Sequence, residues 1–80
     1  SGRETVLLVE DEEALRRFLK VLLESVGYNV LDAPRGEQAL VLDTEHTAPI
    51  HLLLTDVVMA GMSGVELAGR FRQRRRDAAG

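Results

Sequence analysis

The sequence predicts an α/β fold in which a parallel sheet of three strands lies between layers of helices. Three short aliphatic runs alternate along the chain with three segments whose apolar residues recur at helical spacing. Short runs rich in branched aliphatic residues are typical of strands buried on both faces, as in parallel sheets. Each run also ends at a carboxylate residue, so acidic side chains are expected where the strands end.

The alternation places six elements along the chain. Strands are expected at about residues 5–10, 28–32 and 51–56, and helices at about residues 12–26, 36–43 and 63–75. The first helix has one apolar face, with the spacing i, i+3, i+4, i+7, i+8 and i+11, formed by Leu15, Phe18, Leu19, Leu22, Leu23 and Val26. Gly27 follows as the glycine that commonly ends a helix. Ser63 and Glu66 fit the capping box that begins a helix.

The order βαβαβα has consequences for the sheet. Crossovers between parallel strands are right-handed, and a central first strand gives the strand order 2-1-3. This order is the start of a flavodoxin-like, three-layer fold. Ligands of such sheets bind outside the carboxyl ends of the strands, where the strand order reverses. The 80 residues suffice for one domain, which we assign to 1–80.

Composition excludes several classes of protein. The absence of cysteine rules out disulfides and thiolate chemistry and fits a reducing cytoplasm. No apolar run approaches the ~20 residues that span a bilayer, and no signal peptide opens the sequence. We therefore expect a cytoplasmic location and no membrane partner.

The net charge is −3, yet a basic run lies near the end of the sequence, formed by Arg70, Arg72, Arg74, Arg75 and Arg76. We interpret these arginines as solvated side chains that complement the dipole of the third helix. A chain with an acidic net charge is a poor binder of nucleic acid. No direct contact with nucleic acid is expected.

Three carboxylates are predicted to meet at the crevice of the sheet. Glu10 and Asp11 end the first strand, and Asp56 ends the third. Adjacent strands lie about 4.8 Å apart, so these like charges would repel unless a cation intervened. An all-oxygen cluster suits Mg²⁺ before Ca²⁺, and Mg²⁺ often completes its shell with a phosphate. The pocket therefore predicts a phosphoryl-group ligand.

Each carboxylate also has a purely structural interpretation. Asp11 could cap the first helix, Glu10 could be a solvated strand end, and Asp56 could cap the turn before Gly61. The convergence of all three on one crevice favours the functional interpretation.

The sequence resembles the receiver domains of two-component signalling. The resemblance covers residues 5–72 and rests on three segments: the strand from Val6 to the acidic pair, the helix sequence Gly36–Leu40, and Leu52–Gly64, which looks like the phosphoacceptor strand and following loop. It is closest in style to receivers fused to hybrid sensor kinases.

The resemblance implies a role for each site residue. Asp56 would accept a phosphoryl group from a phosphohistidine of a histidine kinase or histidine phosphotransfer protein. Asp11 and Asp56 would bind Mg²⁺ directly, Glu10 would bind it through water, and the backbone carbonyl of Val58 would be a further ligand. The chain would be a phosphoacceptor in signalling and not an enzyme.

The sequence departs from the family pattern in ways that leave an alternative open. The family has five βα units, and these residues resemble the first three, so the Ser or Thr of the fourth strand and the Lys of the fifth are missing. Lys20, the only lysine, lies in the first helix. A truncated or degenerate receiver that acts only as a binding or assembly module is therefore the alternative. An exposed edge on the third strand would favour self-association.

Two further interpretations are disfavoured. Phosphatases of the haloacid-dehalogenase type carry a second Asp two residues after the nucleophile, and Val58 stands there. His46 and His51 have no metal-ligand partner at a useful spacing.

Arg35 stands where the receiver family usually places an Asp or Asn cap, so the second helix is expected to begin less firmly.

Overall fold

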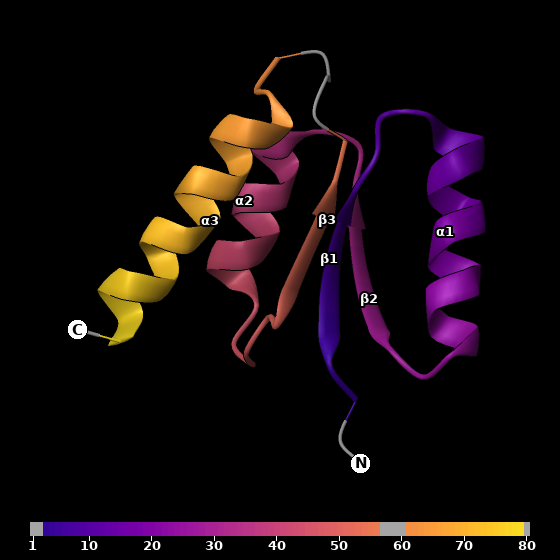
Figure 1. Cartoon of the computed structure of the whole chain (residues 1–80), viewed down its shortest axis with the longest axis horizontal. Coiled ribbons are helices and arrows are strands. Elements are labelled where there is room, and N and C mark those ends of the chain that lie inside the picture. Colours follow the sequence, from indigo (N-terminus) through magenta and orange to yellow (C-terminus); the bar gives the residue numbers. More distant parts are fainter. Residues whose placement is uncertain (1–2, 57–60, 80) are drawn as a thin grey trace.

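The computed structural model describes residues 3–56 and 61–79. The elements, drawn in Figure 1, are β1 (Thr5–Val9), α1 (Glu13–Ser25), β2 (Asn29–Ala33), α2 (Gly36–Glu45), β3 (Leu52–Thr55) and α3 (Gly64–Ala79). The predicted order βαβαβα is confirmed. The third helix runs four residues beyond its predicted end at residue 75. Between residue 75 and Gly80 the sequence contains no Gly or Pro, and Gln73 donates a hydrogen bond of 3.0 Å to Asp77.

The sheet is parallel, with the order β2-β1-β3, as predicted. Helix α1 covers one face, while α2 and α3 lie side by side on the other, so the fold has three layers (Figure 1). Every residue of β1 is buried. Val9 stands opposite Ala33 of β2 and Thr55 of β3, which fixes where the three strands end relative to one another.

The two faces of the sheet are covered unequally. On the side of α2 and α3, a continuous core joins β1 to both helices through Leu7, Val9, Ala39, Leu67 and Phe71. On the other side no residue of α1 is fully buried, and Phe18, Leu22 and Val26 of the predicted apolar face are 48–67% exposed. The apolar face predicted for the first helix is therefore only partly buried.

The ends of the helices agree in part with the sequence. Gly27 has φ +106°, and the N–H groups of Gly27 and Tyr28 bond to the carbonyls of Glu24 and Leu23, which is the Schellman motif. The predicted glycine stop of α1 is thus confirmed. Helix α2 begins after Arg35 without a side-chain cap, as expected.

Half of the predicted capping box is present at α3. The Ser63 hydroxyl accepts the backbone N–H of Glu66 at 3.1 Å. The Glu66 carboxylate instead forms an ion pair of 2.8 Å with Arg70, one turn further along. The predicted capping box also required Glu66 to accept the backbone N–H of Ser63. This bond does not form because Arg70, at i+4, competes for the Glu66 carboxylate.

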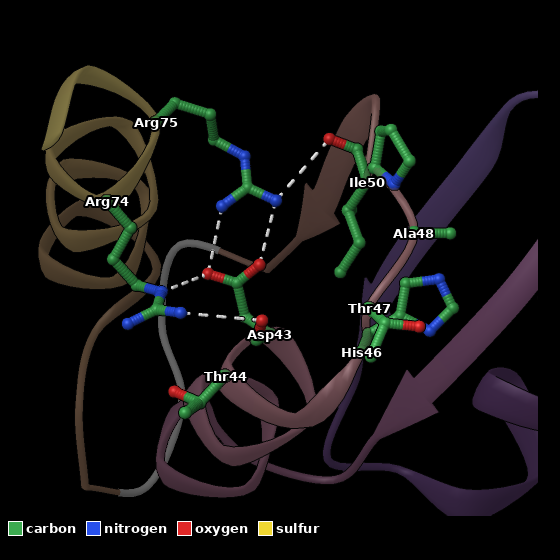
Figure 2. Close-up of a pocket in the computed structure, with 9 residues that line it drawn as sticks. Asp43, Thr44, His46, Thr47, Ala48, Ile50, Arg74 and Arg75 are labelled. Atoms are coloured by element: carbon green, nitrogen blue, oxygen red, sulfur yellow. Dashed lines mark hydrogen bonds and ion pairs between the residues drawn. The ribbon is translucent and has the colours of Figure 1, made fainter. Parts of the chain in front are cut away.

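A buried carboxylate ties the ends of α2 and α3 together. The side chain of Asp43 is 1% exposed and lies between Arg74 at 2.5 Å and Arg75 at 2.7 Å (Figure 2). Arg75 also donates to the Ile50 carbonyl at 3.4 Å and lies over the ring of Phe71, 3.7 Å from its centroid. The side chains of Arg74 and Arg75 are still 41% and 37% exposed, but the interpretation of the arginine run as solvated did not include their pairing with a buried carboxylate.

The sequence contains a signal for the pairing of Asp43 with the two arginines. Asp43 follows Gly36 and Ala39 on the buried stripe of α2, and a carboxylate on such a stripe requires partners. Burial acts to raise the pKa of Asp43, but hydrogen bonds from Arg75 and Arg74 outweigh it and hold the pKa below its ordinary value of 3.8. The charged form of Asp43 therefore stabilises the folded protein.

Replacing Asp43 by Ala should lower the free energy of unfolding at pH 7 by about 2 kcal/mol, because its charge-assisted hydrogen bonds to Arg74 and Arg75 are lost. Since the pKa of Asp43 is lowered on folding, this contribution is present above pH 3.8 and is lost as the pH falls through the folded pKa. Urea unfolding from pH 7 to pH 3 measures it. Asp77→Ala, at an exposed position of α3, is the matched control. A difference between wild type and Asp43→Ala that stays constant over this range would contradict the assignment.

Candidate functional site

The carboxylates predicted to converge do so at the carboxyl edge of the sheet. Glu10 and Asp56 each follow directly after a paired position, Val9 opposite Thr55. One ligand oxygen from each of Glu10, Asp11 and Asp56 lies within 4.8 Å of the other two. Within residues 3–56 and 61–79, no other group of three or more acidic, His or Cys side chains could hold a metal. Val58, the fourth predicted ligand, lies outside the described residues.

Glu10 is buried, and hydrogen bonds hold both its backbone and its side chain. The residue is only 5% exposed, its Oε2 accepts the backbone N–H of Glu12 at 3.0 Å, and its own N–H donates to Ala33 of β2 at 3.1 Å. The interpretation of Glu10 as a solvated strand end is therefore wrong. A buried carboxylate with few partners is costly unless a cation or a proton balances it.

Asp11 and Asp56 are exposed and open to a partner. The capping interpretation of Asp11 fails, because the residue that precedes α1 is Glu12, in an extended conformation and without a side-chain cap bond. The Asp11 carboxylate therefore has no capping role and lies in the acidic cluster with Glu10 and Asp56. Glu10 and Asp56 also line a cavity of about 160 Å³ between α1 and β3, together with aliphatic residues that include Leu8, Leu19 and Leu54.

The electrostatics of Glu10 reflect the crowding of like charges. The hydrogen bond from the Glu12 backbone N–H lowers the pKa of Glu10, but burial and the neighbouring Asp56 and Asp11 carboxyls outweigh it. The net effect raises the pKa above its ordinary value of 4.5. The ionised cluster is therefore strained in the absence of a counter-ion, and a cation bound to it would relieve that strain.

The donor set fits Mg²⁺. All three donors are carboxylate oxygens, the hard ligands that Mg²⁺ takes, and Mg²⁺–oxygen bonds of 2.0–2.1 Å allow two direct ligands to stand at most about 4.2 Å apart. The three oxygens lie within 4.8 Å of one another, close to this separation, so the residues suit a Mg²⁺ site.

Two sets of neighbours support the site, and sequence reasoning missed both. Arg16 of α1 donates to the backbone carbonyl of Glu10 at 2.9 Å. On the other side, the Glu37 carboxylate accepts the Met62 N–H at 3.3 Å and lies beside Gly61, whose φ is +79°. A Cβ at residue 61 would stand 2.9 Å from Glu37, so glycine permits this approach. Neither contact has a local sequence signature, because the partners lie on different elements.

The family is shown by comparison with known proteins. Residues 6–79 match the response regulator receiver domain family. The chain therefore belongs to this family, as its sequence suggested, and its sheet order is that of the receiver fold. Receiver domains are signalling domains of two-component systems, and the acidic cluster stands where the fold binds its ligands.

Individual relatives agree with this assignment. The response regulator receiver protein CpdR of Brucella abortus is 46% identical over 65 residues, which are 81% of this chain and 52% of CpdR. The receiver domain of the hybrid histidine kinase CckA is 43% identical with a TM-score of 0.79, covering 85% of this chain and 63% of that one. The chain thus spans about half the length of CpdR.

A third relative has been solved with two kinds of partner. The response regulator TrrA of Thermotoga maritima, in complex with Mg²⁺ and BeF, is 35% identical with a TM-score of 0.81, covering 92% of this chain and 63% of that one. In its complex with the histidine kinase ThkA, the TM-score is 0.78 at the same identity, and the coverage is 92% and 62%.

Substituting Glu10 by Gln should stabilise the metal-free protein at pH 7. The amide oxygen of Gln can still accept the Glu12 N–H, while the repulsion from Asp11 and Asp56 falls. Because the pKa of Glu10 is raised on folding, the cost of its charge is present at neutral pH and disappears as the pH falls below that pKa. Urea unfolding at pH 7 and pH 4 with a chelator present tests this. A variant less stable than wild type at pH 7 would show that the cluster is not strained.

Proposed function

We propose that the chain is the phosphoacceptor part of a receiver domain and that Asp56 accepts a phosphoryl group from a phosphohistidine in the presence of Mg²⁺. The observation that carries the proposal is the convergence of Glu10, Asp11 and Asp56 within 4.8 Å at the carboxyl edge of the sheet. The complex of TrrA with Mg²⁺ and BeF supports it, because that relative binds a metal with a small anion.

The chemistry assigned to Asp56 is nucleophilic. A carboxylate oxygen attacks the phosphorus of the phosphohistidine, a P–O bond forms as the P–N bond breaks, and the released imidazole takes a proton from solvent. The exposure of Asp56 suits this role, because the donor is a side chain of another protein. The protein is then a substrate in a relay and not an enzyme that turns over a small molecule.

Bound Mg²⁺ would neutralise the charge that develops on the transferred oxygens. Asp11 and Asp56 would bind it directly and Glu10 through water, while the Val58 carbonyl remains a predicted ligand. The buried, hydrogen-bonded Glu10 suits a fixed outer position, and the two exposed carboxylates suit direct contact.

The proposed partner is a histidine kinase or a histidine phosphotransfer protein, and the proposed setting is the cytoplasm. The complex of TrrA with the kinase ThkA supports the class of partner. No helix in the described part of the chain has the length and apolar character to cross a membrane.

Incubation with acetyl phosphate and Mg²⁺ should add the mass of one phosphoryl group to the protein, measured by intact-mass spectrometry. Asp56→Asn should abolish the addition, while Asp77→Asn, the same change on an exposed part of α3, should leave it intact. Mg²⁺ at ten times its dissociation constant should stabilise the wild type by about 1.4 kcal/mol. Labelling that survives in Asp56→Asn would refute the assignment of the phosphoacceptor.

The second candidate is a binding or assembly module without phosphoryl transfer. Lys20 of α1 pairs with Asp32 of β2 at 3.2 Å and forms no ion pair with Asp56 among the described residues. A folded protein that responds to neither Mg²⁺ nor acetyl phosphate would favour this candidate.

We also propose that the 80-residue chain associates with its own copies through the outer edge of β3. Leu52 and Leu54 of β3 are 49% and 40% exposed, and exposed apolar side chains on an edge strand favour pairing with another chain. Light scattering should show a mass that rises with concentration. Leu54→Lys should reduce it, and Val65→Lys, at an exposed position of α3, should not. A monomer at high concentration would contradict this proposal.

A further inference from the structure

Arg16 connects three elements at the carboxyl edge of the sheet. It lies in the first turn of α1, and its side chain is only 16% exposed. Nη1 donates to the backbone carbonyl of Glu10 at 2.9 Å, and Nε donates to Oδ2 of Asp32 on β2 at 3.2 Å. A guanidinium carries its donors in a rigid planar fork, so these two bonds fix the Glu10 carbonyl relative to β2.

The Glu10 backbone is therefore held at both ends of the residue. Its N–H donates to Ala33 at 3.1 Å, and its carbonyl accepts from Arg16. The Glu10 carbonyl belongs to the planar peptide unit from which Asp11 begins, so fixing this oxygen also fixes the direction in which the Asp11 residue leaves the strand. Arg16 thus restrains the backbone of two members of the acidic cluster without being one of its ligands.

Lys20 provides a natural comparison one turn further along α1. Its Nζ lies 3.2 Å from Oδ1 of Asp32, the other oxygen of the carboxylate that Arg16 contacts. No hydrogen bond links Lys20 to Glu10 among the described residues. The two cations therefore share Asp32, but only Arg16 reaches the backbone of the acidic cluster.

We propose that Arg16 is a positioning residue for the Glu10–Asp11 pair and that it raises the affinity of the acidic cluster for a hard divalent cation. This inference rests on the proposed function, since it assumes that the cluster binds Mg²⁺. Outer contacts that orient metal ligands typically contribute ten- to a hundredfold in affinity.

The sign of the effect separates positioning from simple electrostatics. Arg16 is a positive charge near a cation site, so by Coulomb repulsion alone its removal would strengthen Mg²⁺ binding. A positioning role predicts the opposite, a weaker site. Arg16→Met removes both charge and donors. Arg16→Lys retains the charge but replaces the rigid fork with a single ammonium on a flexible stem.

Mg²⁺ titrations followed by backbone amide NMR measure the dissociation constant of each variant. We expect about tenfold weaker binding for Arg16→Met and for Arg16→Lys. Lys20→Met, which removes the neighbouring charge and leaves the Glu10 carbonyl bonded, should change the constant by less than about twofold. Unchanged or tighter binding in both Arg16 variants would overturn the proposal, and so would an equal loss in Lys20→Met.

A second readout needs no metal and keeps the proposal testable if the proposed function fails. The Glu12 N–H is bonded to Glu10 Oε2, so its hydrogen exchange reports the order of the Glu10–Glu12 segment. Relative to the amide of Leu7 in the central strand, which reports global opening, it should exchange about fivefold faster in Arg16→Met than in wild type. A wild type that ignores Mg²⁺ would refute the proposed function, and an unchanged exchange ratio would refute the positioning role.

Discussion

The pairing of β1 with a parallel neighbour on each side is the constraint on which the other features depend. Every residue of β1 is buried between its two neighbours. The register places Val9, the last residue of β1, opposite both Ala33 and Thr55, so the three strands end at the same level. The next residue of β1 and the next residue of β3 are both carboxylates, so the sheet itself forces two like charges together. The acidic cluster is therefore a consequence of register, and the loop that follows β1 only adds its third member.

A buried carboxylate lies near each edge of the sheet, and the pKa values of the two are shifted in opposite directions. At the amino edge, Asp43 has two arginines within ion-pair distance, and its pKa is lowered, so that the charge adds to stability. At the carboxyl edge, Glu10 faces other carboxylates and its pKa is raised, so that its charge opposes folding. The balanced charge of Asp43 contributes to cohesion, and the unbalanced charge of Glu10 marks a candidate binding site.

Sequence patterns predicted what depends on one element at a time. The aliphatic runs gave the strands and their order, and the residue after each run gave Glu10 and Asp56. What the sequence did not disclose depends on pairs of elements: Arg16 with the Glu10 carbonyl, Glu37 with Met62, and Asp43 with two arginines about thirty residues away. Such contacts arise from helix packing on the sheet, and periodicity within one segment carries no information about them. The extra turn of α3 lies beyond the predicted end at residue 75, although the Arg and Ala residues there favour helix.

The register of β1 also bears on the order in which the parts of this chain assemble. Its partners in β2 lie 24 positions along the chain, and those in β3 lie 46 positions along. Closing the longer loop costs about 0.6 kcal/mol more in chain entropy, so the β1–α1–β2 unit is expected to form first and to offer a ready edge to β3. Synthesis from the N-terminus favours the same sequence of events. Strand β3 with Asp56 is thus expected to dock onto a preformed unit that already carries Glu10 and Asp11, so that the proposed metal site is completed last as these three strands fold.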